Sequence, residues 1–265
     1  MMRLAALQMR VACGDVAANI ARIERAAAEA AEAGATILVT PELALTGYGA
    51  GERIRTLAEP ADGPALRRLS AIAASSGVAI IAGFAERADG GVYNSAAYVD
   101  GGERPVIYRK SHLFADYERG LFRPAEPSAV VFHHRGMRCG MLICYDVEFP
   151  ENVRRLAEAG AEAVLVPTAL PVGPSGRFIA EHMIRTRAFE NQVAVAYVNH
   201  CGADELFSFA GLSCIAAPDG SMLAAANPTD EALLVIDFDP EAFARSKREN
   251  TYLRDLRRPG SSQGI

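Results

Sequence analysis

Several features that mark well-known protein classes are missing from this sequence. It contains no tryptophan, and its apolar stretches are broken by charge or glycine well before the roughly 20 residues that span a bilayer. The first ten residues continue directly into a helical pattern and show no small-residue cleavage site, which argues against a signal peptide. We therefore expect a cytoplasmic protein that has no membrane partner.

Positive charge is also in deficit. The 27 Lys and Arg residues are outnumbered by 32 Asp and Glu residues, so the formal net charge is −5 at pH 7. A general nucleic-acid-binding protein neutralises phosphates with clustered Lys and Arg side chains. The local pairs Arg154–Arg155 and Arg257–Arg258 are better interpreted as solvated surface positions. We therefore expect no nucleic-acid partner.

The cysteines form no recognisable framework. The chain has 5 cysteines, an odd number, with neither a CxxC pair nor a Cys/His array of zinc spacing. No GxGxxG motif follows the first expected strand, so the phosphate-binding signature of dinucleotide enzymes is missing as well. These patterns argue against a disulfide framework and a structural metal, and we expect no metal and no cofactor.

The composition is that of a folded protein with a sizeable core. With 265 residues, of which 50% are hydrophobic and 22% charged, the chain can form one large core or two modest ones. We predict a single domain over residues 1–265, in which about 240–265 form a C-terminal extension. The final RRPGSSQGI has the composition of a disordered terminus.

Apolar runs and turn signals predict two βαβ units separated by a meander. In the first half we expect strands at 4–9, 36–39, 78–87, 92–100 and 105–110, and helices at 16–33 and 64–76. In the second half we expect strands at 129–134, 137–143, 161–167 and 193–199, helices at 150–159 and 178–191, and a hairpin-like pair at 211–223 and 232–239. Residues 111–128 show little periodicity and are a candidate functional loop. The pattern predicts an α/β fold, a four-layer α-β-β-α sandwich with two mixed sheets and outer helices.

Cys144 is a candidate nucleophile because it stands between the expected strand 137–143 and a helix that begins at Pro150. A single cysteine is most often a small buried hydrophobe, and a reactive thiol needs a neighbouring base or cation. The 5 histidines, which are the usual partners, lie in no recognisable protease context. Glu42 and Lys110 are better candidates because each lies at the end of its own expected strand. The residues alone leave open whether these strand ends meet.

Three segments of the chain, PELALTGY, YRKSHLFADYE and LICYDVEFPENVRRLAEAGAEAVLVPTAL, resemble the nitrilase superfamily of carbon–nitrogen hydrolases, in the same order and with similar spacing. The resemblance implies a catalytic triad of Glu42, Lys110 and Cys144 and a second glutamate at Glu118. The segments RAFENQVAVAYVNHCG, SCIAAPDGS and YLRDLRRP are most similar to the aliphatic amidase branch that includes 5-aminopentanamidase and an R-stereoselective amidase. The loop TALPVGPSGRF departs from the pattern expected of the aminopentanamidase.

The resemblance implies cysteine-dependent hydrolysis of a small aliphatic or amino-substituted carboxamide to a carboxylic acid and ammonia, through an acyl-thioester intermediate. Glu42 would be the general base, Lys110 would stabilise the oxyanion, and Glu118 would orient the lysine. The expected pocket walls are Tyr48, Tyr145 and the loop that starts at Thr168. The lack of tryptophan favours a small substrate.

Several alternatives remain at this stage. The same triad could serve an N-carbamoyl amino-acid hydrolase or a nitrilase, and a catalytically silent scaffold of the same fold or a redox-active thiol would be functions of another class. The resemblance also implies a homodimer or larger homo-oligomer, formed through the helices near 150–159 and 178–191.

Overall fold

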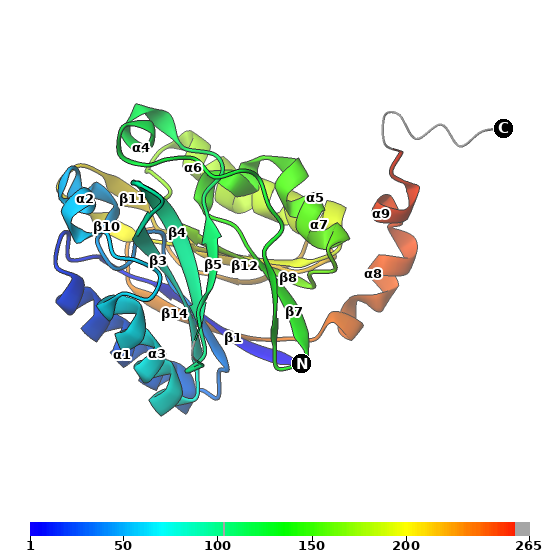
Figure 1. Ribbon diagram of the computed structural model, residues 1–265. Coiled ribbons are helices and arrows are strands. Elements are labelled where there is room, and N and C mark those ends of the chain that lie inside the picture. The colour runs from blue at the N-terminus through cyan, green and yellow to red at the C-terminus, as the bar shows by residue number, and fades with distance from the viewer. Residues whose placement is uncertain (103, 258–265) are drawn as a thin grey trace.

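Two six-stranded mixed sheets lie face to face between outer helices in the computed structural model, which describes residues 1–102 and 104–257 (Figure 1). The first sheet has the order β14 (Ala232–Phe238), β1 (Met2–Gln8), β2 (Ile37–Val39), β3 (Ala79–Ala88), β4 (Gly91–Val99) and β5 (Val106–Arg109). The second has the order β13 (Met222–Ala225), β12 (Cys214–Ala216), β9 (Ala194–Asn199), β8 (Ala163–Thr168), β7 (Met137–Met141) and β6 (Val131–His134).

The outer layers are helices α1 (Val16–Glu32) and α3 (Pro64–Ser76) on the first sheet, and α5 (Pro150–Glu158) and α7 (Ile184–Asn191) on the second (Figure 1). Capping residues mark the ends of these helices. The Asp15 side chain accepts the backbone N–H of Ala18 at the start of α1, and α3 begins with Pro64 and ends at Gly77 with a left-handed φ of 69°. The predicted four-layer α-β-β-α sandwich is confirmed.

Two apolar cores hold the layers together. Alternate residues of β1 and β2, such as Ala5 and Leu38, pack outward against Ile23 of α1 and Leu69 of α3. The neighbouring residues of the same strands point to the other face of the sheet and pack against the second sheet. The shared core between the sheets fixes the position of one set of strand ends relative to the other.

The direction of the strands brings the candidate residues to the same end of the sandwich. In the first sheet β1, β2 and β3 are parallel, and two antiparallel pairings then make β5 run in the same direction as β3. In the second sheet β7, β8 and β9 are parallel. The short helices α2 (Arg53–Leu57), α4 (Ala115–Leu121) and α6 (Pro174–Phe178) and the hairpin of β10 (Cys201–Ala203) and β11 (Ser208–Ala210) lie at the same end of the molecule (Figure 1).

Two expectations about local structure are wrong. Residues 232–239 do not pair with 211–223, because β14 lies antiparallel to β1 in the first sheet while β12 and β13 form their own hairpin in the second. Residues 111–128 are not free of regular structure, because α4 forms within them around two buried side chains, Glu118 and Leu121. The helix expected at 178–191 is longer than predicted, since it begins at Pro174 as α6 and passes through a π-helical turn, Ile179–Met183, into α7.

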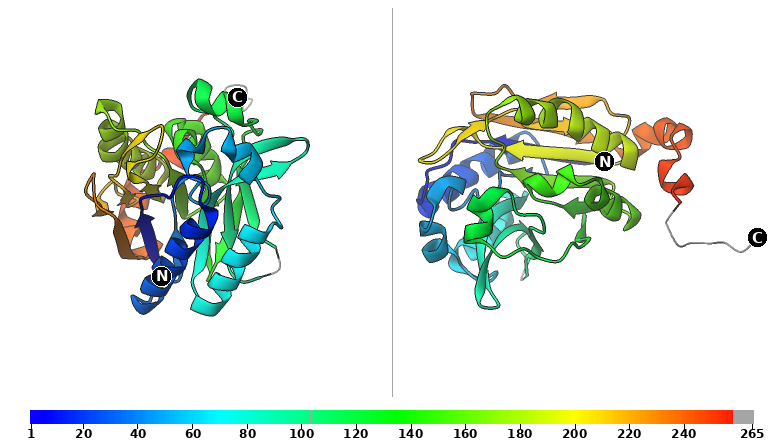
Figure 2. Two further views of the ribbon diagram at one scale, coloured as in Figure 1. Left: turned by 90° about the vertical axis from the view of Figure 1, so that its left-hand side faces the viewer. Right: turned by 90° about the horizontal axis from the view of Figure 1, so that it is seen from above.

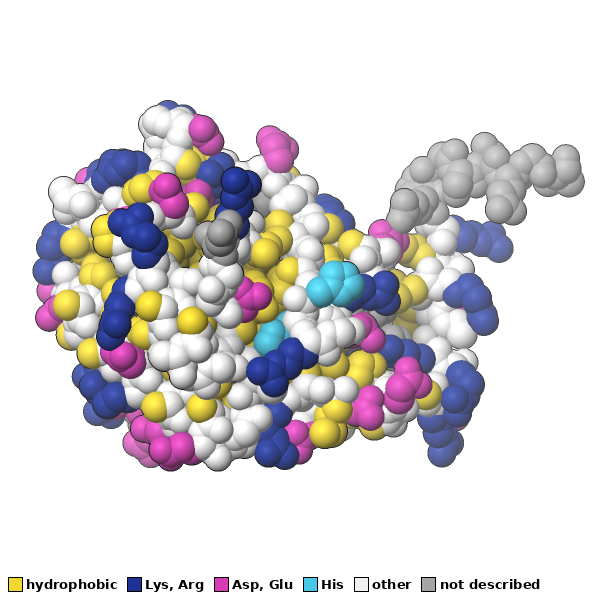
Figure 3. Space-filling view, turned by 60° about the horizontal axis from the view of Figure 1, so that its bottom comes forward, with side chains coloured by type: hydrophobic (Ala, Val, Ile, Leu, Met, Phe, Trp, Pro, Cys, Tyr) yellow, Lys and Arg dark blue, Asp and Glu magenta, His cyan; other side chains and the backbone are white. Residues whose placement is uncertain are grey.

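The chain after β14 runs past the end of the sheets and contacts the outer helix α7, where the rings of Tyr252 and Phe189 meet edge to face. The helical segments Pro240–Phe243, α8 (Ala244–Glu249) and α9 (Tyr252–Asp255) extend to one side of the molecule (Figures 1 and 2). Basic side chains gather on this projection, as Figure 3 shows; they include Arg245, Lys247, Arg248 and Arg254. Most of the terminus predicted to be disordered lies outside the described residues. Within the described ranges no helix is both long and apolar enough to cross a membrane.

Candidate active site

Four predicted site residues meet in one buried cluster between the two sheets. Glu42 follows β2, Lys110 directly follows β5, Glu118 lies on α4, and Cys144 comes soon after β7. Glu42, Lys110 and Glu118 are completely buried, and Cys144 is 7% exposed. Charged side chains are almost never fully buried unless they are paired, and a buried charged cluster of this kind is a candidate functional site.

Lys110 lies between the two glutamates. Its Nζ is 2.6 Å from Oε1 of Glu42 and 2.7 Å from Oε1 of Glu118. Burial alone lowers the pKa of Lys110, but the charges of Glu118 and Glu42 outweigh burial and raise it well above the usual lysine value. The ammonium group is therefore a permanent positive charge in a site that excludes water.

Glu118 is itself held by two further donors. The hydroxyl of Tyr48 donates to Oε1 at 2.8 Å, and the backbone N–H of Phe114 donates to Oε2 at 2.8 Å. These contacts explain why α4 forms, since its first turn is stabilised by a carboxylate that is also bound to Lys110. They also fix the second carboxylate in place.

Glu42 has one occupied and one free carboxylate oxygen. Lys110 Nζ and Asn94 Nδ2 both donate to Oε1, at 2.6 and 2.7 Å. Oε2 is buried and has no hydrogen-bond partner in the described part of the chain. Burial raises the pKa of Glu42 to about 7, with the charge of Lys110 opposing and that of Glu118 adding to the shift. A carboxylate with this pKa and an open oxygen is suited to accept a proton near neutral pH.

The backbone of Glu42 is fixed from the second sheet. Its N–H donates to the carbonyl of Thr168 at 3.2 Å, and His200 Nε2 lies 2.7 Å from its carbonyl oxygen. Burial lowers the pKa of His200 to about 4, so the ring is neutral and Nε2 must carry its hydrogen to donate to a carbonyl. On the other side Gly83 allows close approach, because a Cβ there would lie 2.3 Å from the nitrogen of Leu43.

Cys144 has a strained backbone conformation. The strand stops at Met141, earlier than predicted, and Cys144 begins a short 3₁₀ helix, Cys144–Glu148, with a φ of 45°. Positive φ at a residue other than glycine is uncommon and clusters at active sites. Burial raises the pKa of the thiol well above its usual value; the charge of Glu42 adds to this, whereas that of Lys110 opposes it. The resting sulfur is therefore a thiol, and its proton needs an acceptor.

Asp146 ties the Cys144 turn to the segment after Lys110. Its buried carboxylate accepts hydrogen bonds from Tyr108 Oη at 2.9 Å, Ser111 Oγ at 2.8 Å and the backbone N–H of His112 at 2.9 Å. Because Lys110 lies within this bonded stretch and Cys144 lies two residues before Asp146, the contacts fix the distance between lysine and sulfur.

The three residues expected to line the substrate pocket lie in different settings. Tyr48 contacts Glu118 through its hydroxyl, and its ring packs against Tyr117 and Phe207. Tyr145 is half-buried, with its ring in edge contact with Phe114 and Phe149. Thr168 is buried, and its hydroxyl donates to the carbonyl of Val166 in its own strand. Direct contact of these three residues with substrate stays a prediction.

Sequence reasoning missed Asn94, Asp146 and His200. Asn94 follows a tyrosine in an expected strand, Asp146 is adjacent to the candidate nucleophile motif, and His200 comes directly after a strand. Only Asp146 could have been suspected from the sequence, because it stands beside Cys144 and Tyr145. The roles of Asn94 and His200 depend on partners 52 and 158 residues away, which a single sequence does not reveal.

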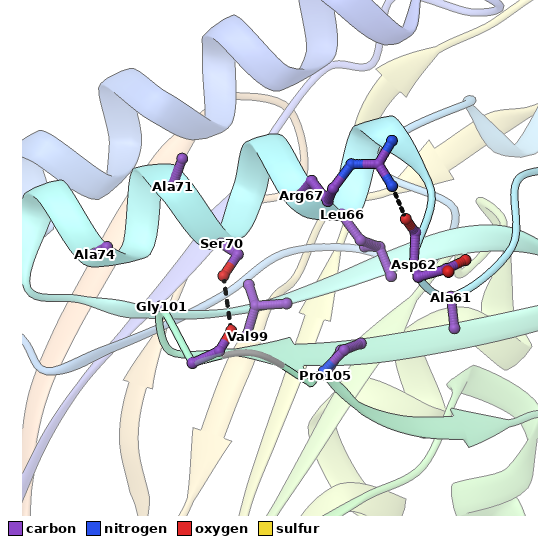
Figure 4. A pocket seen from close by; sticks show the side chains of 11 residues that line it. Ala61, Asp62, Leu66, Arg67, Ser70, Ala71, Ala74, Val99, Gly101 and Pro105 are labelled. Carbon is purple, nitrogen blue, oxygen red and sulfur yellow. Dashed lines mark hydrogen bonds between the residues drawn. The ribbon is translucent and has the colours of Figure 1, made fainter.

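A cavity of about 410 Å³ lies between α3 and the backbone near Val99 and Pro105 (Figure 4). Arg67 donates to the carbonyl of Asp62 at one end, and Ser70 to that of Gly102 at the other. The described residues that line it include none of the cluster around Lys110. Residues 1–102 and 104–257 contain no group of three or more His, Cys, Asp or Glu side chains that could hold a metal ion.

The buried Glu, Lys, Glu and Cys cluster on a four-layer sandwich defines the class. Residues 3–248 match the model of the carbon-nitrogen hydrolase family, so the chain belongs to that family and is an enzyme that hydrolyses carbon–nitrogen bonds. The resemblance to the nitrilase superfamily is confirmed.

Individual relatives are amidases or hydrolases. A Pseudomonas protegens protein described as a hydrolase in the pqqF 5′ region is 46% identical, over 97% of this chain and 89% of that protein. An (R)-stereoselective amidase from Pseudomonas sp. is 37% identical, over 97% of this chain and 92% of the amidase. A solved structure of the Nesterenkonia AN1 amidase has a TM-score of 0.86 at 33% identity, over 97% of this chain and 94% of that one. The same amidase in complex with butyramide has a TM-score of 0.83 at 32% identity, over 96% and 97% of the two chains.

Proposed function

We propose that this enzyme hydrolyses a small aliphatic or amino-substituted carboxamide to a carboxylic acid and ammonia, with Cys144 as nucleophile, Glu42 as general base, Lys110 as oxyanion stabiliser and Glu118 as the residue that orients the lysine. The observation that carries the proposal is the free Oε2 of Glu42, which is buried without a partner in the described residues while Oε1 is occupied. That oxygen is the available acceptor for the thiol proton.

In the first half-reaction, Glu42 takes the Cys144 proton as sulfur attacks the amide carbon. The new C–S bond sends the carbonyl electron pair to oxygen, where the ammonium of Lys110 and the backbone N–H of Tyr145 stabilise the negative charge. A preorganised donor of this kind contributes roughly 3 kcal/mol. When the intermediate collapses, the C–N bond breaks, protonated Glu42 gives its proton to nitrogen, and ammonia leaves. The raised pKa of the thiol supports proton transfer during attack rather than a standing thiolate.

In the second half-reaction, water replaces ammonia. Glu42 takes a proton from the water as its oxygen attacks the thioester carbon, and Lys110 again faces the oxyanion. The C–S bond then breaks, the sulfur recovers its proton from Glu42, and the carboxylic acid leaves. The steps balance with water as the only co-substrate.

Small amides are favoured by three observations. Cys144 is only 7% exposed, so the reacting carbonyl must enter a narrow space. The similar Nesterenkonia amidase has been solved in complex with butyramide, a short aliphatic amide. The chain itself has no tryptophan with which to line a large aromatic pocket.

The experiment is an ammonia-release screen over primary amides, N-carbamoyl compounds and nitriles, with wild type and Cys144→Ala. We expect release from amides by wild type and none by the variant, with unchanged thermal unfolding. The buried Cys139→Ala is the matched control, because it removes a thiol from β7 outside the cluster. Ammonia release by Cys144→Ala at the wild-type rate would refute the assignment of the nucleophile. Ammonia release from nitriles or carbamoyl compounds alone would show that the substrate is one of these compounds and not an amide.

We further propose a homodimer or larger homo-oligomer. The projecting α8 and α9 support it, because Tyr252, Leu253 and Leu256 are apolar and 47%, 37% and 46% exposed. Light scattering on a purified sample tests the proposal, and a monomer at all concentrations would contradict it. Location in the cytoplasm stays a prediction from the sequence.

A further inference from the structure

One carboxylate closes the turn of the β10–β11 hairpin and also binds a second segment of the chain. Asp204 directly follows β10, and its Oδ1 accepts the backbone N–H groups of Leu206 at 2.9 Å and Phe207 at 2.8 Å. An aspartate commonly closes a turn in this way, by binding the backbone two residues further along the chain. The other oxygen, Oδ2, accepts the backbone N–H of Gly49 at 2.7 Å. The hairpin is thus bound to the short 3₁₀ helix Tyr48–Ala50 through an oxygen that the turn itself does not use.

This close approach requires a glycine at position 49. A Cβ on Gly49 would lie 2.1 Å from Oδ1 of Asp204 and 2.4 Å from Oδ2. The backbone of Gly49 has a φ of −84° and a ψ of 18°, a conformation that residues with side chains also adopt. The space for the carboxylate, and not the backbone conformation, therefore accounts for the glycine.

The segment that Asp204 holds carries a donor of the catalytic cluster. Tyr48 is its first residue, and the hydroxyl of Tyr48 donates to Oε1 of Glu118 at 2.8 Å. The same oxygen accepts from Nζ of Lys110 at 2.7 Å. A displacement of the phenol would therefore change the position of the oxygen that binds the ammonium group.

The ring of Tyr48 is packed between the hairpin and α4. Its centroid lies 5.2 Å from that of Phe207 in the hairpin and 5.5 Å from that of Tyr117 in α4. The hydroxyl of Tyr117 also donates to the carbonyl of Tyr48 at 2.6 Å. Because Tyr117 directly precedes Glu118, a change in the hairpin is transmitted to the carboxylate through Tyr48 and its neighbours.

We propose that Asp204 is a positioning residue for catalysis, which acts on Glu118 through Tyr48. The carboxylate of Asp204 holds the backbone beside Tyr48, and the phenol then holds Oε1 of Glu118. That oxygen fixes the direction in which the ammonium of Lys110 points. The inference rests on the proposed amidase function, in which Lys110 stabilises the oxyanion, and it assigns the hydroxyl of Tyr48 to the cluster and not to the substrate.

The substitution Asp204→Asn separates the contact with Gly49 from the fold of the hairpin. Asparagine closes the same turn as aspartate, so its one acceptor oxygen stays with the N–H groups of Leu206 and Phe207. Its Nδ2 then faces the N–H of Gly49, which is another donor, and this hydrogen bond is lost. We expect kcat for ammonia release from an amide to fall about 3- to 10-fold, with KM within about twofold of the wild-type value, because no contact with substrate is removed.

A second variant reaches the same contact from the other side. In Gly49→Ala the new Cβ would displace the carboxylate of Asp204, while the residues of the hairpin stay unchanged. We expect the same loss in kcat as in Asp204→Asn.

The matched control is Glu205→Gln, which changes a charged residue in the same turn. Glu205 pairs with Arg53 at 2.6 Å, and the two side chains are 61% and 49% exposed. Exposed ion pairs contribute little to stability. Both kcat and KM of this variant should equal those of wild type.

A double-mutant cycle distinguishes positioning from a merely structural role. Tyr48→Phe keeps the ring and removes the hydroxyl, so kcat should fall about 10- to 100-fold through the lost hydrogen bond to Glu118. In the double variant Asp204→Asn/Tyr48→Phe, kcat should match that of Tyr48→Phe alone within about twofold, because the hydroxyl on which Asp204 acts is already missing. A residue that only supports the fold would add its own loss.

Three results would overturn the inference: wild-type kcat in Asp204→Asn, a loss in the double variant equal to the product of the two single losses, or a raised KM at unchanged kcat in Tyr48→Phe. The last result would place the hydroxyl of Tyr48 on the substrate. Each of these results leaves wild-type ammonia release, and therefore the amidase function, intact. A wild-type protein that releases no ammonia from any amide would instead refute the proposed function, and the inference with it.

Discussion

Replacing Glu118 with glutamine tests whether the second carboxylate both orients Lys110 and raises the pKa of Glu42. Oε1 of Glu118 accepts from Lys110 at 2.7 Å and from Tyr48 at 2.8 Å, and its charge raises the pKa of Glu42. Glutamine keeps the size of the side chain and one acceptor oxygen but removes the negative charge. The substitution therefore isolates the electrostatic role from the packing role.

The expected loss of activity follows from the weaker hydrogen bonds that the glutamine would make with Lys110 and Tyr48. A hydrogen bond to a charged group contributes about 1.5–3 kcal/mol, which corresponds to a loss of roughly 10- to 150-fold in kcat if it is expressed in the transition state. Removing the charge of Glu118 also lowers the pKa of Glu42. Because Glu42 must be unprotonated to act as base, the acid limb of kcat/KM should move to lower pH.

The assay is ammonia release from one amide between pH 5 and 9, with wild type, Glu118→Gln and the exposed control Glu151→Gln. Equal thermal unfolding of the three proteins separates an electrostatic effect from loss of the fold. The reasoning is refuted if Glu118→Gln keeps wild-type activity, or if its acid limb stays in place or moves to higher pH.

Two further predictions follow from the same cluster. Wild-type kcat/KM for an uncharged amide should fall as pH drops through about 7, because burial raises the pKa of Glu42 to about that value and only the ionised form accepts the thiol proton; a rate independent of pH from 5 to 8 would contradict this. Asp146→Ala should lower the free energy of unfolding by about 3 kcal/mol or more, since it leaves buried donors of Tyr108 and the segment after Lys110 without an acceptor, and should reduce kcat as well. Urea unfolding and ammonia release check both effects, and wild-type values in either measurement would show that Asp146 does not hold the two loops together.

Local chemistry explains why much of the sandwich could be predicted. The helix after Asp15 has a capping side chain and an apolar stripe, α5 begins with Pro150, and the strands β3 and β4 are joined by a glycine turn. Each of these signals is complete within a few residues. The segment around α4 gave no such signal, because its helix depends on a carboxylate bound to Lys110 and Tyr48.

The prediction was wrong about which strands pair when they are far apart in the sequence. An alternating strand such as β14 specifies which face it buries, but it does not specify its neighbour, and here the neighbour is β1 at the other end of the chain. Asn94 and His200 were missed for the same reason, since each acts on Glu42 across a sheet or between sheets.

The sequence by itself determined the alternation of strands and helices, the two-sheet architecture and, through three ordered motifs, the choice of Glu42, Lys110, Glu118 and Cys144 as candidate site residues. Only the tertiary structure decided how these residues act together. Burial between two sheets removes water, so the charges of Lys110, Glu42 and Glu118 depend on one another, and the hydrogen bonds that occupy Oε1 of Glu42 leave Oε2 free.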